Sequence, residues 1–421
     1  MPAEVVHPLP ADLLPPLYSA AMRAYLSENH GTMAPWRERA VDLDRAWAAV
    51  EHGRVVGTLR TIDDTVTVPG APGGRAARVD ADLLSLVSVN PTHRRQGLLR
   101  RMLDGSLTEA HDRGLAVSVL VAAEYEIYGR FGYAPAAFET RFDVHAHRPG
   151  ARVAGERTGS MREVDPLEAS ELAPSVYEAE CDLRAGMIGR DELWWDRELR
   201  RWGQDREVVR SVDQPTPRHA VHLDADGAVD GYVSWAVQTR DEGADLGTLE
   251  VSALFASTPV GYRELWRFLL GIDLIDRLDY PGRPVDDPLS WLLADARTAR
   301  IRGGSDAMWL RILDVPDALS ARGYHVEDEL VLDVVDPAVG NWAGGRFRLT
   351  ASPAGATCVP APEATPDLRL PARTLSSLYL GGVRAGVLGR AGGFDEETPG
   401  AGARLDHLFA TPLAPWRGTD F

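Results

Sequence analysis

The chain has 421 residues, of which 44% are hydrophobic and 25% charged, a composition typical of a globular protein with two or three domains. Its formal net charge of −17 argues against nucleic acid as a partner, because phosphate binding needs a basic surface. The same charge would attract a cationic small molecule or a basic peptide, although simple solubility also accounts for it.

No apolar run approaches the roughly 18–20 residues that a membrane helix needs. The opening, MPAEVVHPLPADLL, lacks the basic and apolar regions of a secretory signal. Cys181 and Cys358 are too few for a disulfide framework. We therefore expect a cytoplasmic protein with no membrane partner.

The first segment mixes short strands with helices. It predicts a capped helix over 10–26, paired strands over 46–62, a Gly/Pro/Ala-rich loop over 68–81, a strand over 82–89, a loop and amphipathic helix over 90–114, a strand over 115–123, a helix over 124–133 and a strand over 138–144. This order of elements predicts a mixed α/β sheet.

A polar stretch rich in Gly and Pro, residues 146–160, marks a boundary. The second segment predicts strands over 219–238 and 247–258 and a helix over 261–278, which roughly echoes the first segment. A third segment opens near residue 299 with further strands and helices. We therefore expect three domains, over 1–145, 146–298 and 299–421.

The sharpest motif is LVSVNPTHRRQGLLRRML, residues 86–103. A strand ends at Val89, and a helix follows the glycine of the Arg-Arg-Gln-Gly turn. Unpaired N–H groups at a helix start, together with the helix dipole, bind a pyrophosphate well, and Gly97 allows its close approach. A solvated basic face is the alternative explanation for the arginines.

In its sequence context this motif resembles the acetyl-CoA loop of the GCN5-related N-acetyltransferases. The stretch EIYGRFGYAPA (126–136), the three-segment length and the chain end resemble the Eis (enhanced intracellular survival) branch of that superfamily. Other members often carry Gly or Ala two positions after the loop glycine. This chain carries Leu99 there, as the Eis branch does.

The resemblance implies a fold and a set of site residues. The fold would be tandem acetyltransferase-like domains, the second degenerate, followed by a sterol-carrier-like domain whose tail enters the active site. The assembly would be a homohexamer, and acetyl-CoA would be the cosubstrate. Tyr128 would be the general acid, and the terminal carboxylate of Phe421 the general base. The implied cofactor contacts are Val87, Ser88, Val89, Arg94, Arg95, Gln96, Gly97, Leu98, Leu99, Arg100, Ala123 and Glu124.

Ordinary pKa values limit these roles. A tyrosine of pKa about 10 gives its proton to a thiolate of pKa about 8.5 at a cost of about 2 kcal/mol. A carboxylate of pKa about 3.5 would need about 9 kcal/mol to deprotonate an alkylammonium of pKa about 10.4. The carboxylate of Phe421 must therefore act late, through water or with help from burial, and it can also anchor an ammonium.

Three residues are candidates for acceptor binding: Glu28, Trp36 and Asp420. Trp36 offers a π face to a cation, whereas Glu28 and Asp420 can equally be solvated. Trp194, Trp195 and Trp202 have helical spacing and are expected in a core or an interface. His93, His145 and His147 lack the partners of a metal site, so no metal is expected.

The leading hypothesis is thus an N-acetyltransferase that acts on cationic amines, aminoglycoside-like antibiotics among them. A protein or peptide lysine acetyltransferase would use the same machinery. A noncatalytic protein that binds CoA or a lipid is the alternative from another class.

Overall fold

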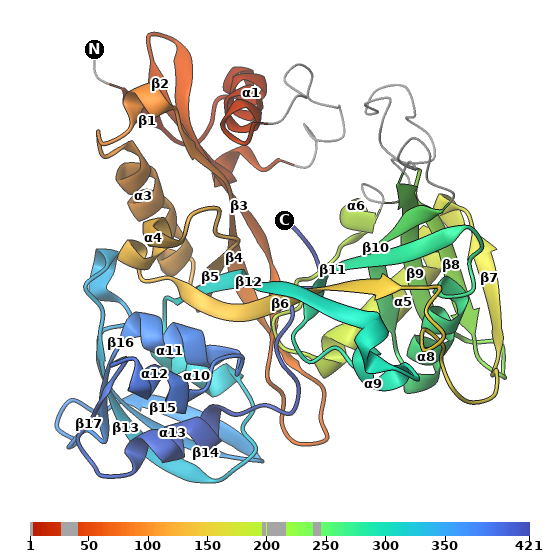
Figure 1. Ribbon diagram of the computed structural model, residues 1–421. Coiled ribbons are helices and arrows are strands. Elements are labelled where there is room, and N and C mark those ends of the chain that lie inside the picture. The colour runs from red at the N-terminus through yellow and green to blue at the C-terminus, as the bar shows by residue number, and fades with distance from the viewer. Residues whose placement is uncertain (1–2, 27–40, 196–198, 200–215, 239–245) are drawn as a thin grey trace. The chain divides into compact units, whose positions relative to one another are not determined.

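The chain passes twice between two units, once in strand β6 (Ala134–His145) and once in strand β12 (Ala299–Ile312). One unit holds residues 1–137 and 306–421, and the other holds residues 138–305. The computed structural model describes residues 3–26, 41–195, 199, 216–238 and 246–421 (Figure 1).

The first unit contains a sheet with the strand order β1-β2-β3-β4-β5-β12. Its strands are β1 (Glu4–Val6), β2 (Ala46–Glu51), β3 (Arg54–Val68), β4 (Ala77–Val89), β5 (Val117–Leu120) and the end of β12, and its helices are α1 (Leu14–Ala24), α3 (Leu98–Asp112) and the short α4 (Tyr125–Tyr128). β4 and β5 run parallel, and each other described pair in this sheet is antiparallel.

The segment 68–81, expected to be a loop, is divided between a loop and the ends of two strands. β3 runs to Val68 and β4 begins at Ala77, so the hairpin turn spans only residues 69–76. Val79 and Ala81 are buried while Asp80 between them is exposed, which is the alternation of a strand with one covered face. The glycines and alanines of the segment obscure this pattern in the sequence.

Helix α3 packs closely on the sheet. Its buried residues include Leu98, Met102 and Leu103, which join Trp47 of β2 in one apolar cluster. The approach needs Gly105, because a Cβ at that position would lie 2.7 Å from the ring of Trp47. The core thereby fixes the start of α3 beside the end of β4.

The same unit carries a second sheet of five strands, in the order β15-β14-β13-β16-β17. Its elements are α10 (Val315–Ala321), β13 (Asp328–Val335), β14 (Gly345–Ser352), β15 (Gly355–Pro360), β16 (Leu368–Pro371), α11 (Ala372–Tyr379), α12 (Ala385–Arg390), β17 (Asp395–Glu396) and α13 (Ala401–Phe409). After α13 a tail without helix or strand runs to Phe421.

The second unit forms a sheet in the order β6-β11-β10-β9-β8-β7. Its elements are β7 (Ser160–Val164), α5 (Pro166–Leu183), α6 (Glu192–Trp195), β8 (Arg218–Leu223), β9 (Val229–Gln238), β10 (Gly247–Ala256), α8 (Pro259–Leu269), β11 (Ile275–Pro284) and α9 (Leu289–Leu292). Trp235, Trp266 and Tyr280 are buried in its apolar core.

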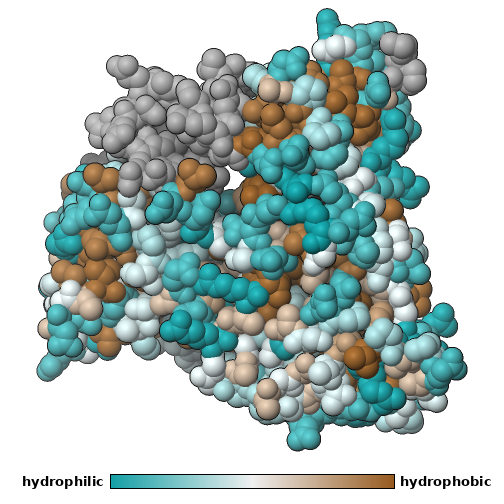
Figure 2. Space-filling model, turned by 180° about the vertical axis from the view of Figure 1, so that it is seen from behind, coloured by the Kyte–Doolittle hydropathy of each residue, from teal (hydrophilic) through white to brown (hydrophobic). Residues whose placement is uncertain are grey.

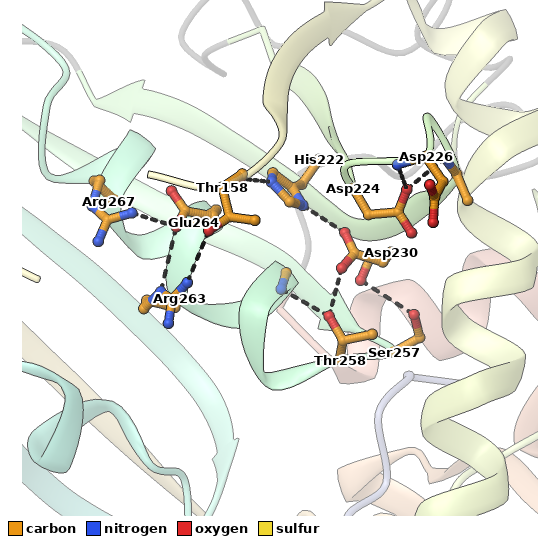
Figure 3. Close-up of polar contacts among 12 residues, drawn as sticks. Thr158, His222, Asp224, Asp226, Asp230, Ser257, Thr258, Arg263, Glu264 and Arg267 are labelled. Carbon is orange, nitrogen blue, oxygen red and sulfur yellow. Dashed lines mark hydrogen bonds and ion pairs between the residues drawn. The ribbon is translucent and has the colours of Figure 1, made fainter. Parts of the chain in front are cut away.

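A buried polar cluster attaches α8 to this sheet (Figure 3). His222 bonds Asp230 through Nδ1 at 2.5 Å and the carbonyl of Thr158 through Nε2 at 2.7 Å. Thr258 donates to Asp230 and caps α8 by accepting from the N–H of Gly261 at 2.9 Å. Each of these polar groups has a hydrogen-bond partner within the fold, so the cluster stabilises the packing of α8 on the sheet.

The face shown in Figure 2 is mostly hydrophilic, and its apolar side chains form separate patches. Within the described ranges, no helix is both long enough and apolar enough to span a bilayer.

Candidate active site

Strands β4 and β5 separate partway along the first sheet. They pair only from Ala81 to Leu84 on β4 and from Val117 to Leu120 on β5. β4 continues to Val89 and there keeps β3 as its partner. The N–H of Asn90 donates to Val56 on β3 at 2.8 Å, so by strand alternation the peptide groups of Val89 face away from β3. The end of β4 therefore offers an open backbone edge.

A bulge bends β4 at the start of this edge. The register of β3 and β4 shifts between Thr58 and Arg60, and Leu86 has a φ of 51°, in the left-handed region. The buried hydroxyl of Thr58 donates to the carbonyl of Leu86 at 2.6 Å and lies 2.7 Å from the hydroxyl of Ser88. Thr58 thus fixes the bend, and such bends often lie beside active sites.

The turn from β4 into α3 is braced on one side. The side chain of Asn90 accepts from the N–H of Thr92 at 3.1 Å, and His93 bonds Glu51 of β2 at 2.9 Å. This bond to His93 is the main reason why the pKa of Glu51 lies below its usual value. The turn is therefore held in place before the basic residues begin.

The basic part of the turn ends at an uncapped helix start. Gly97 has a φ of 75°, and neither a capping side chain nor an acidic residue lies in the first turn of α3. Arg94, Arg95 and Arg100 are exposed, and none makes an ion pair with another described residue. Free N–H groups, the helix dipole and three arginines with no ion pair among the described residues are the features that favour an anion at a helix start.

Tyr128 closes the short helix α4, which follows β5 after the exposed residues Ala123 and Glu124. Its side chain is 6% exposed and packs edge-on against Tyr133, with ring centroids 6.2 Å apart. Burial, and then the nearby Tyr25 and Glu124, raise the pKa of Tyr128 above its usual value. The hydroxyl therefore stays protonated at neutral pH.

The tail returns to β4. Trp416 and Thr419 are buried, and Ser85 donates from Oγ to a backbone oxygen of Phe421 at 3.1 Å. Ser85 immediately precedes the bulge residue Leu86. The last residue of the sequence thus lies against the strand whose open edge forms the candidate site.

Asp420 is paired within the tail. Its carboxylate lies 2.6 Å from the guanidinium of Arg417, and its side chain is 87% exposed. A surface pair of this kind is weak, so the carboxylate can still attract a cation. Glu28 and Trp36, the other predicted acceptor residues, lie outside the described residues.

A buried polar chain lies where β4 and β5 still pair. Ser118 of β5 donates to the carboxylate of Asp82 on β4 at 2.8 Å and lies 2.6 Å from the hydroxyl of Tyr133. Asp82 is 1% exposed, and burial raises its pKa to about 6. The chain of bonds ties the segment after Tyr128 to both strands.

Thr58, Ser85, Asp82 and Tyr25 lie at or beside the candidate site, although no sequence motif contains them. In the sequence they resemble ordinary strand or helix residues, and only long-range pairing reveals their contacts. Among the described residues, no group of three His, Cys, Asp or Glu side chains could hold a metal ion.

The described cysteine and tryptophan residues named in the sequence analysis belong to the core. Both cysteines are buried. Trp195 is buried beside Trp194, as expected for a core residue, and Trp202 lies outside the described ranges.

Comparison with known proteins covers nearly the whole chain. Models of the acetyltransferase (GNAT) domain match residues 6–136 and 186–312, and a model of the sterol carrier protein domain matches residues 315–418. The chain is 36% identical to N-acetyltransferase Eis of Mycobacterium tuberculosis over 373 residues, 85% of this chain and 84% of that protein. The chain belongs to the Eis branch of the GCN5-related N-acetyltransferases.

Other relatives agree with this membership. An N-acetyltransferase of Streptomyces griseus is 39% identical over 386 residues, 90% of each chain. The crystal structure of Eis1 from Mycobacterium abscessus superposes with a TM-score of 0.83 at 29% identity, covering 99% of this chain and 100% of that one. This Eis-branch protein is therefore an N-acetyltransferase. The predicted fold class, two acetyltransferase domains followed by a sterol-carrier-like domain, is confirmed.

Proposed function

We propose that this enzyme binds acetyl-CoA at the open edge of β4 and transfers the acetyl group to amines of cationic acceptors such as aminoglycoside-like antibiotics. One observation carries the proposal: an open strand edge leads directly into an uncapped helix start lined by three exposed arginines that make no ion pair with a described residue. GCN5-related acetyltransferases in general use acetyl-CoA, whose thioester supplies an activated acetyl group.

The residues present fit that molecule. The peptide groups of Val87 and Val89, with Ser88 between them, would bond the amides of the pantetheine arm as an added strand does. Arg94 to Arg100 would bind the pyrophosphate, with Gln96, Gly97, Leu98 and Leu99 supplying backbone N–H groups. A Cβ at Gly97 would have no heavy atom within 4 Å, so the turn is open at that point. Ala123 and Glu124, just beyond the end of β5, would lie near the acyl group.

Tyr128 would hold a proton for the leaving sulfur. Because burial raises its pKa, transfer to a free thiolate is more costly than for an ordinary tyrosine. The proton must therefore move as the bond to sulfur breaks, with the neutral hydroxyl donating a hydrogen bond to the developing charge. We accordingly assign Tyr128 the role of general acid.

The carboxylate of Phe421 would act on the acceptor nitrogen. Its bond to Ser85 and the buried anchors Trp416 and Thr419 would hold it against β4. A carboxylate deprotonates an amine far more easily after the nitrogen has begun to bond to carbon, so the base acts late or through a water molecule. Before that step the carboxylate would anchor the acceptor's ammonium group, which must lose one proton to solvent water before the neutral amine attacks the thioester.

The net charge of −17 supports a cationic acceptor. Asp420 beside the terminal carboxylate, together with Glu28 and Trp36, would line the acceptor site.

We also propose that the enzyme is a homohexamer and that it is located in the cytoplasm. The mass of the purified protein in solution, measured by light scattering, tests the assembly.

The proposal is tested by measuring thiol release from acetyl-CoA with a panel of amines. We expect release with aminoglycosides and polyamines and much less with neutral amino sugars. Release only with lysine peptides would instead identify a peptide acetyltransferase. No release with any amine, combined with tight CoA binding, would identify a binding protein.

A further inference from the structure

Tyr25 reaches the open edge of β4 from a distant part of the chain. It follows α1 directly, and its hydroxyl donates to the carbonyl of Val87 at 3.3 Å, across 62 positions of the sequence. Val87 is the first residue after the bulge at Leu86. By strand alternation from Asn90, the carbonyl of Val87 faces away from β3, so its bond to Tyr25 is made at the open edge.

The hydroxyl of Tyr25 also lies near Tyr128. The two phenols interact electrostatically, and Tyr25 contributes to the raised pKa of Tyr128. Burial likewise raises the pKa of Tyr25, although 45% of its side chain is exposed. Tyr25 is thus open to solvent on one side, while its hydroxyl lies against β4.

The backbone of Tyr25 is fixed, whereas its ring is partly exposed. Its backbone N–H closes α1 by donating to Ala21 at 3.0 Å. The helix packs on the sheet, and Tyr18 accepts a bond from Arg60 of β3 at 3.0 Å. Among hydrogen bonds to described residues, rotation of the ring would break the bond to Val87, which at 3.3 Å is longer than a typical O–H···O hydrogen bond.

We infer that the Tyr25 hydroxyl occupies the Val87 carbonyl in the free enzyme and must leave it when the pantetheine arm of acetyl-CoA binds. An added strand needs that carbonyl as an acceptor for its own amide N–H. The free enzyme therefore satisfies the edge of β4 with its own tyrosine, and acetyl-CoA competes with Tyr25 for the site. This inference rests on the proposed acetyl-CoA site.

The competition makes an unusual prediction about affinity. Loss of a contact normally weakens binding, whereas loss of the Tyr25 hydroxyl removes a competitor. The Tyr25→Phe variant keeps the ring and deletes only the hydroxyl. Since a neutral hydrogen bond contributes about 1 kcal/mol net, the variant should bind CoA about fivefold more tightly than the wild type.

Isothermal titration of the full chain with CoA measures this directly. Tyr18→Phe is the matched control, because it removes a hydroxyl from the same helix whose partner is Arg60 on β3. Its CoA affinity should equal that of the wild type. In turnover assays Tyr25→Phe should lower the KM for acetyl-CoA, whereas a merely structural role would lower kcat without lowering KM.

The outcomes separate this inference from the proposed function. If the wild type binds no CoA, the proposed site and the competition are both wrong. If the wild type binds CoA and Tyr25→Phe binds it equally or more weakly, the site stands and the competition is wrong. Tighter binding by Tyr25→Phe, with Tyr18→Phe unchanged, supports the inference.

Discussion

Ser85 Oγ donates a hydrogen bond to a backbone oxygen of Phe421 at 3.1 Å, joining residues 336 positions apart. Ser85 lies next to the β4 bulge, and Phe421 ends a tail anchored by the buried Trp416. The contact places the end of the sterol-carrier-like domain on the acetyltransferase sheet. A terminal carboxylate at this point would be part of the active site.

Substitution of Ser85 tests this contact. Ser85→Ala should lower kcat about tenfold, because the carboxylate loses the donor that orients it, and should lower the free energy of unfolding by only about 1 kcal/mol. Ser85→Thr keeps the hydroxyl and should restore part of the rate. Unchanged kcat in Ser85→Ala would show that the bond has no role in turnover.

Extension of the chain tests the carboxylate itself. A few residues added after Phe421 should impair turnover strongly, because they convert the carboxylate to a neutral amide. Folding should change little, since Trp416 and Thr419 lie upstream of the change. The same residues added at the other end of the chain are the control. Full activity in the C-terminally extended enzyme contradicts the role of Phe421.

Gly97 precedes helix α3 and Gly114 follows it, so the two glycines allow a matched test of the turn proposed to bind the pyrophosphate. Gly97 and Gly114 have φ values of 75° and 79°, and a Cβ at either would meet no heavy atom within 4 Å. Alanine at either position should lower the free energy of unfolding by about 1 kcal/mol through backbone strain. Only Gly97→Ala should weaken CoA binding, by about tenfold in a titration. Equal CoA affinity in the two variants would place the anion elsewhere.

The raised pKa of Asp82 makes the free energy of unfolding depend on pH in a predictable direction. Its pKa is about 6 in the fold because burial disfavours the charged form, against an ordinary value of 3.8. The folded state therefore binds the proton more tightly, and stability is lost as the pH rises from about 4 through 6. Asp82→Asn cannot be ionised and should not lose this stability. The free energy of unfolding of the variant minus that of the wild type should therefore be up to about 3 kcal/mol larger at pH 8 than at pH 4, measured by urea unfolding. Parallel pH profiles would contradict the raised pKa.

The sequence predicted the elements around the cofactor turn well. The motif sets the end of the strand at Val89 and the start of the helix after Gly97, and both agree with the structure. The signal was strong because turn residues, arginines and an apolar helix face follow one another locally. The predicted loop over 68–81 was correct over residues 69–76 and wrong at its ends, because Val68 belongs to β3 and residues 77–81 begin β4.

Contacts between distant segments could not be predicted in this way. Nothing near Ser85 or Tyr25 in the sequence indicates a partner, because each partner lies on another element. Asp82 looks like a solvated residue in VDADLL, yet it is buried because β5 supplies Ser118 directly opposite. These pairings depend on strand register and on the path of the tail.

Tyr128→Phe tests the role of Tyr128 as general acid most directly, by comparing turnover with cofactor binding. This variant keeps the buried ring and removes only the proton donor. We expect kcat to fall by at least about 100-fold, the usual contribution of a general acid, while CoA affinity by titration stays within about twofold. Turnover close to that of the wild type, with CoA still bound, would show that Tyr128 is not the general acid.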